Sequence, residues 1–343
     1  MKSFCKRFGV VLLVMTFLLC SGGGFLAKAK AKVFELSLAT KMGPQSPEYK
    51  AIEYFVELVE KKSRDRLEIS IFGSEVLGTD ETVFKGVKMG AVDIYVGSIN
   101  IAPRMFVPEL DYITPPFVYE DFNHFIRFCK SDYAKGKFEE LSKKANVVML
   151  NTEWTWRRGP FRVLCTKKPI KSIDDLKGLK LRFYPSKLEL EVWKSLGANP
   201  IVIAWSETYL ALQQGIVEAV TSPVTLILDT KFVEVCPYVT REDEYPQTIC
   251  FFMNKDKFQI LSKDLQKALM DACNEAGTRF TNSLDAIAEE ILGEAKTQYN
   301  AKFSEIDMGP FIKKARQYYE ELRKKGTTPK EFWEVLDAIE AVR

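Results

Sequence analysis

The sequence contains a single histidine, His124, in 343 residues. Serine and cysteine hydrolases commonly use a histidine as general base, and no Gly-x-Ser-x-Gly elbow accompanies this one. The sequence also lacks histidines and cysteines clustered for a metal ion, and it has no Gly-rich phosphate loop. We therefore expect no catalytic residues, no metal site and no cofactor. We interpret His124 as an isolated histidine on the surface.

Cysteines are few and show no local pairing. Seven are present, and no Cys-x-x-Cys motif occurs among the five that follow residue 29. Most have apolar neighbours, so we predict free thiols buried among hydrophobic side chains. A single disulfide formed after export is the alternative. The five are Cys129, Cys165, Cys236, Cys250 and Cys273.

Only one long apolar run occurs, at residues 8–20, directly after the basic residues Lys2, Lys6 and Arg7. Small residues and Ala-x-Ala sites follow it, as they do before a signal-peptide cleavage site. The run is shorter than the ~20 apolar residues that span a bilayer. A cleaved signal peptide over residues 1–29 is therefore favoured over a membrane anchor, and we expect export to the periplasm.

Positive charge is concentrated in that leader. The formal charge of the chain is +3, and it falls to −1 when the four basic residues before position 30 are removed. No clustered basic stripe remains, so we expect no nucleic-acid partner. The rest of the chain is too long for one simple core, which predicts two lobes. We expect the protein to be a monomer.

The first part of the exported chain alternates strands and helices. This β-α-β-α-β order implies a parallel sheet, whose ligands lie beyond the carboxyl ends of the strands. Polar residues at those ends are therefore candidate ligand-binding residues: Thr40, Lys41, Ser98 and Asn100. The predicted strands are 33–41, 67–72 and 92–96, and the predicted helices are 48–64 and 80–89.

The middle of the chain repeats the alternation and predicts a second α/β lobe. Residues 262–303 then form a pattern typical of one continuous helix, with almost no helix-breaking residues. At ~1.5 Å per residue, a helix of this length is longer than one lobe. Two amphipathic helices are predicted after residue 310. The predicted strands in the middle of the chain are 147–151, 161–166, 179–183, 200–204 and 217–221, with helices at 187–196 and 207–214.

Two arginines, Arg162 and Arg182, lie in apolar, strand-like segments with no nucleophile or base beside them. A guanidinium offers a planar fork that matches a carboxylate, and a partly desolvated guanidinium prefers an anionic partner. The pair predicts a clamp for a carboxylate ligand. The alternative, which composition alone leaves open, is that each arginine pairs with an internal Asp or Glu.

From residue 33 to about residue 302 the chain resembles the DctP-type solute-binding proteins of tripartite ATP-independent periplasmic (TRAP) transporters. The motifs are Gly-Ser-Glu-Val-Leu-Gly at 73–78, Asp-Leu-Lys-Gly-Leu-Lys-Leu-Arg at 175–182, Gly-Ala-Asn-Pro at 197–200 and Ser-Glu-Thr-Tyr-Leu-Ala-Leu-Gln at 206–213. The resemblance implies two α/β lobes joined by crossing strands, with one long helix across both. It also implies that Arg182 binds the ligand carboxylate, that Arg162 assists, and that TRAP membrane permease subunits are the partners.

The chain departs from the family pattern around the predicted pocket. Ser222 stands where an asparagine is common, and Trp205 replaces a smaller apolar residue. Together with Tyr184 and Trp154, these residues predict a partly aromatic pocket. We therefore expect a less hydroxylated monocarboxylate or dicarboxylate, such as a 2-oxo, branched-chain or aromatic acid, rather than a sugar acid. Arg157 and Arg158 are interpreted as part of a solvated hinge surface.

These observations predict an α/β, two-lobed periplasmic binding protein that closes around a small organic acid by hinge motion. The first lobe is assigned to residues 33–159 with about 248–287, and the second to 160–247 with about 288–343. A secreted hydrolase on an α/β scaffold and a ligand-sensing subunit of a signalling system are the alternatives. Ligand recovered unchanged, with one-to-one stoichiometry, would favour the receptor over the hydrolase, and a neighbouring gene for a histidine kinase rather than a membrane permease would favour the sensor.

Overall fold

The structure, a computed structural model, describes residues 32–343. The predicted signal peptide lies outside the described residues. Residues 33–343 form one unit that contains two β-sheets. We call the sheet that contains β1, with the helices packed on it, the first lobe, and the other sheet with its helices the second lobe. Within the described part, no helix combines the length and the hydrophobicity needed to cross a membrane.

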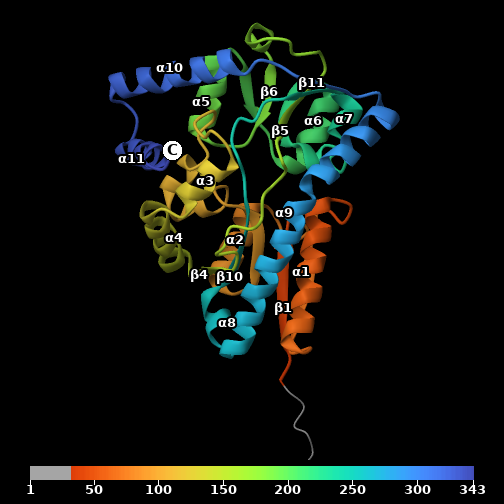
Figure 1. Ribbon diagram of the computed structural model, residues 1–343, viewed down its shortest axis with the longest axis vertical. Helices are drawn as coiled ribbons and strands as arrows, with labels where there is room; N and C mark the ends of the chain where they lie inside the picture. Colours follow the sequence, from red (N-terminus) through yellow and green to blue (C-terminus); the bar gives the residue numbers. More distant parts are fainter. Residues whose placement is uncertain (1–31) are drawn as a thin grey trace, which may run out of the picture. The chain divides into compact units, whose positions relative to one another are not determined.

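The first lobe is built on a five-stranded sheet in the order β2-β1-β3-β10-β4 (Figure 1). β1 pairs in parallel with β2 and β3, which confirms the predicted β-α-β-α-β start. β10 was not predicted; it comes from far along the chain and pairs antiparallel with β3 and β4, so the sheet is mixed. The elements are β1 (Phe34–Thr40), α1 (Pro47–Ser63), β2 (Leu67–Phe72), α2 (Asp80–Met89), β3 (Ile94–Ser98), α3 (Phe122–Cys129), α4 (Asp132–Ala145), β4 (Val147–Met149), β10 (Ile249–Asn254) and α8 (Lys255–Gln259).

Local sequence signals fix the ends of α1. The Ser46 hydroxyl accepts a hydrogen bond from the backbone N–H of Tyr49, and proline occupies the first helical position, as is favourable at a helix start. Arg64 adopts a left-handed conformation and ends the helix. The helix buries an apolar stripe that includes Ile52 and Phe55. This stripe joins the apolar cluster formed by the first sheet and α9.

The second lobe holds a six-stranded sheet in the order β11-β9-β5-β8-β6-β7. β6 pairs in parallel with β7 and β8, whereas β5 is antiparallel to β8 and β9. β9 and β11 were not predicted, because strands of only four residues carry little periodic signal. The elements are β5 (Arg162–Thr166), β6 (Lys180–Phe183), α5 (Lys187–Leu196), β7 (Asn199–Val202), α6 (Thr208–Gln214), β8 (Ala219–Pro223), α7 (Phe232–Val235), β9 (Tyr238–Arg241) and β11 (Lys302–Glu305).

One helix, α9 (Lys263–Tyr299), runs along both lobes (Figure 1). It packs against α1 of the first lobe and against α7 of the second, which confirms the predicted spanning helix. The predicted end at residue 303 was wrong. Asn300 adopts a left-handed conformation and ends the helix, and the chain then forms β11.

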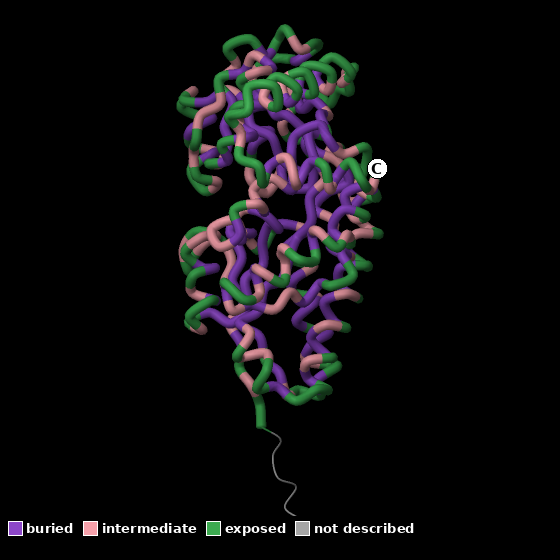
Figure 2. Tube along the Cα trace, turned by 90° about the vertical axis from the view of Figure 1, so that its left-hand side faces the viewer, coloured by how far each residue is buried: buried purple, intermediate pink, exposed green. Residues whose placement is uncertain are grey.

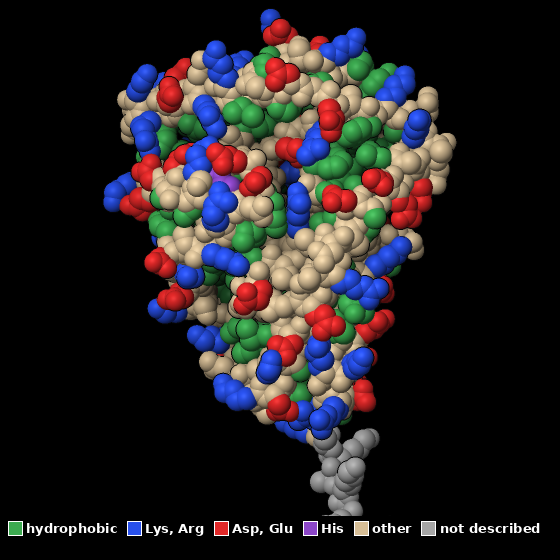
Figure 3. Space-filling model, viewed as in Figure 1, with side chains coloured by type: hydrophobic (Ala, Val, Ile, Leu, Met, Phe, Trp, Pro, Cys, Tyr) green, Lys and Arg blue, Asp and Glu red, His purple; other side chains and the backbone are tan. Residues whose placement is uncertain are grey.

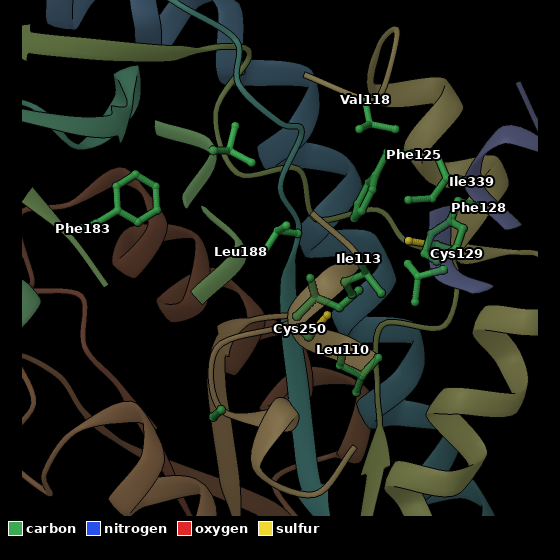
Figure 4. Packing of buried hydrophobic residues seen from close by; sticks show 14 of the residues in the cluster. Leu110, Ile113, Val118, Phe125, Phe128, Cys129, Phe183, Leu188, Cys250 and Ile339 are labelled. Carbon is green, nitrogen blue, oxygen red and sulfur yellow. The ribbon is translucent and has the colours of Figure 1, made fainter. Parts of the chain in front are cut away.

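The two predicted C-terminal helices are present as α10 (Gly309–Lys325) and α11 (Lys330–Glu340). α10 packs on α5, whereas α11 packs on α3 and on the short helix at Pro108–Tyr112. Figure 4 shows Ile339 of α11 beside Phe125 and Phe128 of α3. The tail thus contacts both lobes, and the boundaries that we assigned to them stay a prediction.

The interpretation of His124 as a surface residue was wrong. Its side chain is fully buried, and one ring nitrogen lies 2.9 Å from the carbonyl oxygen of Ile339. The other ring nitrogen lies 3.3 Å from the backbone nitrogen of Glu120. This histidine therefore anchors α11 on α3.

Buried residues occur throughout both lobes, and exposed residues lie mainly on the outer helices and loops (Figure 2).

The thiol prediction is confirmed for the described part of the chain. All five cysteines there are free and buried, and none forms a disulfide. Burial raises the pKa of Cys165 and Cys273 well above the usual thiol value, which keeps both thiols protonated and unreactive. They act as small apolar side chains of the core.

Candidate functional site

A cavity of about 220 Å³ lies between the two lobes. The first lobe contributes the segments that follow β1 and β3 and the start of α2. The second lobe contributes residues at the ends of β6, β7 and β8 and the arginine that opens β5. The cavity therefore gathers the carboxyl ends of strands from both sheets, where α/β proteins place ligands. Of the predicted site residues, Arg182, Arg162, Tyr184 and Lys41 line it.

Arg182 projects from β6 into this cavity. Its side chain is 7% exposed, and its Nε donates a hydrogen bond of 2.9 Å to the carbonyl oxygen of Ile203. Its guanidinium carbon lies 5.2 Å from the centroid of the Trp205 ring. Among the described residues no carboxylate forms an ion pair with it, and neither terminal nitrogen donates a hydrogen bond. Burial lowers the pKa of Arg182 to about 10, which reflects a charge that lacks a close counter-ion.

Arg162 has a different environment. Its Nε and Nη2 both donate to one carboxylate oxygen of Glu244, at 3.0 and 2.8 Å. Nη1 donates to Gln247, and Nη2 also donates to Thr221. Burial opposes its charge, but Tyr245 and the neighbouring glutamates outweigh burial and raise the pKa above the ordinary arginine value. The alternative of an internal carboxylate partner therefore holds for Arg162 and not for Arg182.

The other cationic side chains in the cavity lining are also matched by carboxylates. The ammonium nitrogen of Lys41 lies 3.0 Å from a carboxylate oxygen of Asp80, and Nη1 of Arg104 lies 3.0 Å from a carboxylate oxygen of Asp111. Arg158 binds both oxygens of Glu48, at 2.8 and 2.5 Å, and is 4% exposed. The interpretation of Arg158 as a solvated surface residue was therefore wrong. Because each of these cations has its own anion, Arg182 stands out as the unmatched one.

Tyr184 connects the cavity to a buried polar network across the lobes. Its hydroxyl donates to Glu189 of α5 and accepts from Asn100 Nδ2 at 3.4 Å. The Asn100 amide also donates to Thr114, 2.9 Å away. Burial, together with the nearby Glu244, raises the pKa of Glu189 well above its usual value and so favours its protonated form. The network fixes the orientation of the Tyr184 hydroxyl.

Trp205 lies between cations from the two lobes. Arg182 contacts the Trp205 ring from the second lobe, and the ammonium nitrogen of Lys41, from the first lobe, lies 5.6 Å from the centroid of the same ring. The Phe232 ring packs edge-on against Trp205, with the ring centroids 5.2 Å apart, and holds the indole against the second lobe. The ring therefore supports the guanidinium and forms part of the cavity wall.

The remaining predicted site residues do not line the cavity. Ser98 accepts a hydrogen bond from Gln247, which does line it, and Asn100 supports Tyr184 as described. Thr40 is 4% exposed and accepts from the backbone of Met42. Ser222 lies between Thr221 and Pro223, which face the cavity, so its side chain points to the other face of the sheet. Trp154 packs against Phe138 in the core.

Sequence reasoning missed several lining residues. The guanidinium carbon of Arg162 lies 4.4 Å from the centroid of the Tyr245 ring, and the Gln247 side-chain oxygen accepts a hydrogen bond from the same guanidinium. Both lie in the segment that crosses back to the first lobe, which has no periodic pattern. Glu75 lines the cavity from a loop, and the motif at 73–78 was the only available signal.

The described residues contain no cluster of His, Cys, Asp and Glu that suits a metal ion. On the face shown in Figure 3, basic and acidic side chains are interspersed and form no large patch of one sign. The unpaired and nearly buried guanidinium of Arg182 in the cavity favours capture of an anion there.

Comparison with known proteins identifies a family. The model of the bacterial extracellular solute-binding protein family 7 (DctP) matches residues 38–325. The sialic acid-binding periplasmic protein SiaP of Vibrio cholerae is 27% identical over 285 residues, which cover 82% of this chain and 87% of that protein. The 2,3-diketo-L-gulonate-binding periplasmic protein YiaO of Escherichia coli is 28% identical over 228 residues, which cover 66% of this chain and 68% of that protein.

A solved structure agrees with these matches. The sugar acid binding protein DctPAm from Advenella mimigardefordensis, in complex with galactonate, superposes with a TM-score of 0.79 at 25% sequence identity. The superposition covers 92% of this chain and all of that one. The similarity includes both lobes.

Proposed function

The chain belongs to the bacterial extracellular solute-binding proteins of family 7, and we propose that it captures its ligand through Arg182. Members of this family are periplasmic receptors of TRAP transporters for small organic acids. The resemblance and the two-lobed fold predicted from sequence are confirmed. The family consists of receptors and not of enzymes, so the hydrolase alternative loses its support.

The lone charge of Arg182 is the observation that carries the proposal. A nearly buried cation without a counter-ion is costly, and an anionic ligand removes that cost. Its Nε is occupied by Ile203, whereas the two terminal nitrogens are free to hold both oxygens of one carboxylate. Arg162 touches the same cavity but is already paired with Glu244, so we assign it a supporting role.

The cavity favours a ligand with a single carboxylate. Lys41, Arg104 and Arg158 each have a carboxylate partner, so a second ligand carboxylate would find no unpaired cation. A dicarboxylate would therefore bury an uncompensated charge. This narrows the expectation from sequence to monocarboxylates.

Ligand binding is proposed to close the lobes. Lys41 of the first lobe meets Trp205 of the second across the cavity, so the site is complete only when the lobes approach. A ligand that contacts both lobes stabilises the closed state by its differential affinity. We propose that this state is delivered, as a monomer, to a TRAP membrane permease. The sensor function remains the second candidate, and a histidine kinase that binds the closed form in place of a permease would favour it.

The test is calorimetry of Arg182→Ala with the acid that native mass spectrometry finds in the purified protein. Losing one member of a desolvated charge pair costs on the order of 2–5 kcal/mol, so affinity is expected to fall at least tenfold. Arg182→Lys should restore part of it. Arg323→Ala, which removes an exposed guanidinium outside the cavity, is the control. Unchanged affinity in Arg182→Ala would refute the proposal, as would recovery of a chemically altered ligand.

A further inference from the structure

The cavity contains an unpaired carboxylate as well as an unpaired cation. Of the carboxylates in its lining, Asp80 is bound to Lys41 and Glu81 to Arg104. Glu75 also lines the cavity, but within the described residues its side-chain carboxylate takes part in no hydrogen bond and no ion pair. Arg182 and Glu75 thus leave one charge of each sign available, and they come from opposite lobes.

The backbone holds Glu75 at this position. Ser74 and Glu75 have φ values of 54° and 57°, a left-handed conformation that is uncommon for residues with a side chain. The turn is fixed by hydrogen bonds from Ser74 N–H to the Met42 carbonyl and from Gly78 N–H to the Glu75 carbonyl, at 3.0 and 2.8 Å. Unfavourable backbone conformations of this kind persist where the surroundings impose them, often at ligand sites.

The charge of Glu75 acts on the place where the ligand carboxylate is proposed to bind. Glu75 is among the groups that oppose the effect of burial on the pKa of Arg182, so its carboxylate lies within electrostatic range of that guanidinium. A ligand carboxylate on Arg182 would bring a second negative charge beside Glu75. The nearby cations are already matched and offer no compensation. A ligand that carries only a negative charge would therefore be repelled.

We infer that the ligand is a zwitterion, with a carboxylate for Arg182 and a positively charged nitrogen for Glu75. This inference rests on the proposed function and specifies its ligand class. A hydroxyl group would supply a hydrogen bond to Glu75 but would leave the negative charge of Glu75 uncompensated, because Arg182 is already paired with the ligand carboxylate. An amino acid or a methylated amino acid satisfies both side chains at once.

The test uses series of ligands that differ at one group. Each series shares a carbon skeleton and carries an amino, a hydroxyl or an oxo group: leucine with its 2-hydroxy and 2-oxo acids, phenylalanine with its analogues, and alanine with lactate and pyruvate. γ-Aminobutyrate, glycine betaine, butyrate and glucuronate extend the range. Binding is measured by calorimetry on protein freed of bound ligand. The tightest ligand is expected to carry a cationic nitrogen and to exceed its hydroxy and oxo analogues at least tenfold.

Variants connect this preference to Glu75. Glu75→Gln keeps the shape of the side chain and removes its charge. The affinity for the ligand with a cationic nitrogen should therefore fall at least tenfold, whereas the affinity for its oxo analogue should change less than threefold. Glu289→Gln removes an exposed carboxylate of α9 outside the cavity and should change neither value. The inference is overturned if no cationic ligand binds, if an oxo, hydroxy or sugar acid binds most tightly, or if Glu75→Gln keeps the full preference. Arg182→Ala separates the two proposals: loss of all binding there, with no effect of Glu75→Gln, contradicts the zwitterion alone.

Discussion

The guanidinium of Arg182 and the indole of Trp205 form a cation–π pair at the cavity wall, with the guanidinium carbon 5.2 Å from the ring centroid. The guanidinium carbon of Arg162 likewise lies 4.4 Å from the centroid of the Tyr245 ring. The guanidinium carbon of Arg104 lies 5.7 Å from the centroid of the Tyr184 ring. An aromatic face attracts a guanidinium and leaves its edge, where the N–H groups lie, free to bind. These three arginines are therefore oriented by rings, and Arg162 and Arg104 are also held by carboxylates.

Replacing Trp205 should weaken ligand binding through Arg182. A cation–π contact contributes ~0.5–2 kcal/mol, so Trp205→Ala is expected to lower affinity by about 2- to 30-fold, and Trp205→Phe by less. Calorimetry with the native acid measures the effect. Phe232→Leu, which alters packing behind the ring but leaves the indole in place, is the control. Equal losses in Trp205→Ala and Phe232→Leu would show that the ring acts only by packing.

Arg162→Ala should unfold the ligand-free protein more easily. It leaves Glu244 buried without its main partner, and breaking such a pair costs about 3–5 kcal/mol. The free energy of unfolding in urea, measured without ligand, should fall accordingly. Arg241→Ala removes two solvent-accessible ion pairs of the neighbouring strand β9, with Asp243 and Glu305, and should cost about 1 kcal/mol or less. A stability loss no larger than that of the control would contradict the structural role of Arg162.

Glu189 should make stability depend on pH. Burial raises its pKa in the folded protein, so the folded state keeps a proton that the unfolded state releases above about pH 4.3. Stability from this group is therefore present at low pH and decreases as pH rises through and beyond the unfolded pKa. Glu189→Gln removes the titration, so its stability relative to the wild type should increase between pH 4 and pH 7. A constant difference across this range in urea titrations would argue that Glu189 is ionised.

The sequence predicted Arg182 because its signal is local: a short apolar strand with one arginine, inside a recognisable motif. The distinction between Arg182 and Arg162 was not predictable, because it depends on Glu244, which lies 82 residues further along the chain. The burial of His124 likewise depends on Ile339, 215 residues away. Pairings at such separations are set by the fold and not by neighbouring residues.

The position of Ser222 relative to the cavity depends on strand register. Thr221 and Ser222 are neighbours on β8 and face opposite sides of the sheet, but the sequence does not show which side is the cavity. Since Ser222 and Trp154 do not line the cavity, the expectation against sugar acids depends only on Tyr184 and Trp205 and stays a prediction. The predicted helix at 48–64 was accurate, because its capping residue, its proline and its apolar stripe all agree.

Glycine at position 277 of α9 should be required where the helix meets the crossing segment. A Cβ atom there would lie 2.4 Å from the Trp156 ring and 2.5 Å from the Thr155 hydroxyl. Trp156 is fixed, since its Nε1 donates a 2.7 Å hydrogen bond to the Cys273 carbonyl. Gly277→Ala is therefore expected to lower the free energy of unfolding by about 1–3 kcal/mol, as overpacking does.

Gly293 provides the matched control in the same helix, because a Cβ atom there meets nothing within 4 Å. Gly293→Ala should raise the free energy of unfolding by about 0.5–1 kcal/mol, since alanine loses less backbone entropy in a helix. Urea denaturation of both variants measures the two effects together. Opposite signs would establish that contact with Trp156, and not helix propensity, sets the requirement at Gly277. A stabilised Gly277→Ala would mean that the crossing segment yields, and the α9 junction would then be looser than this packing implies.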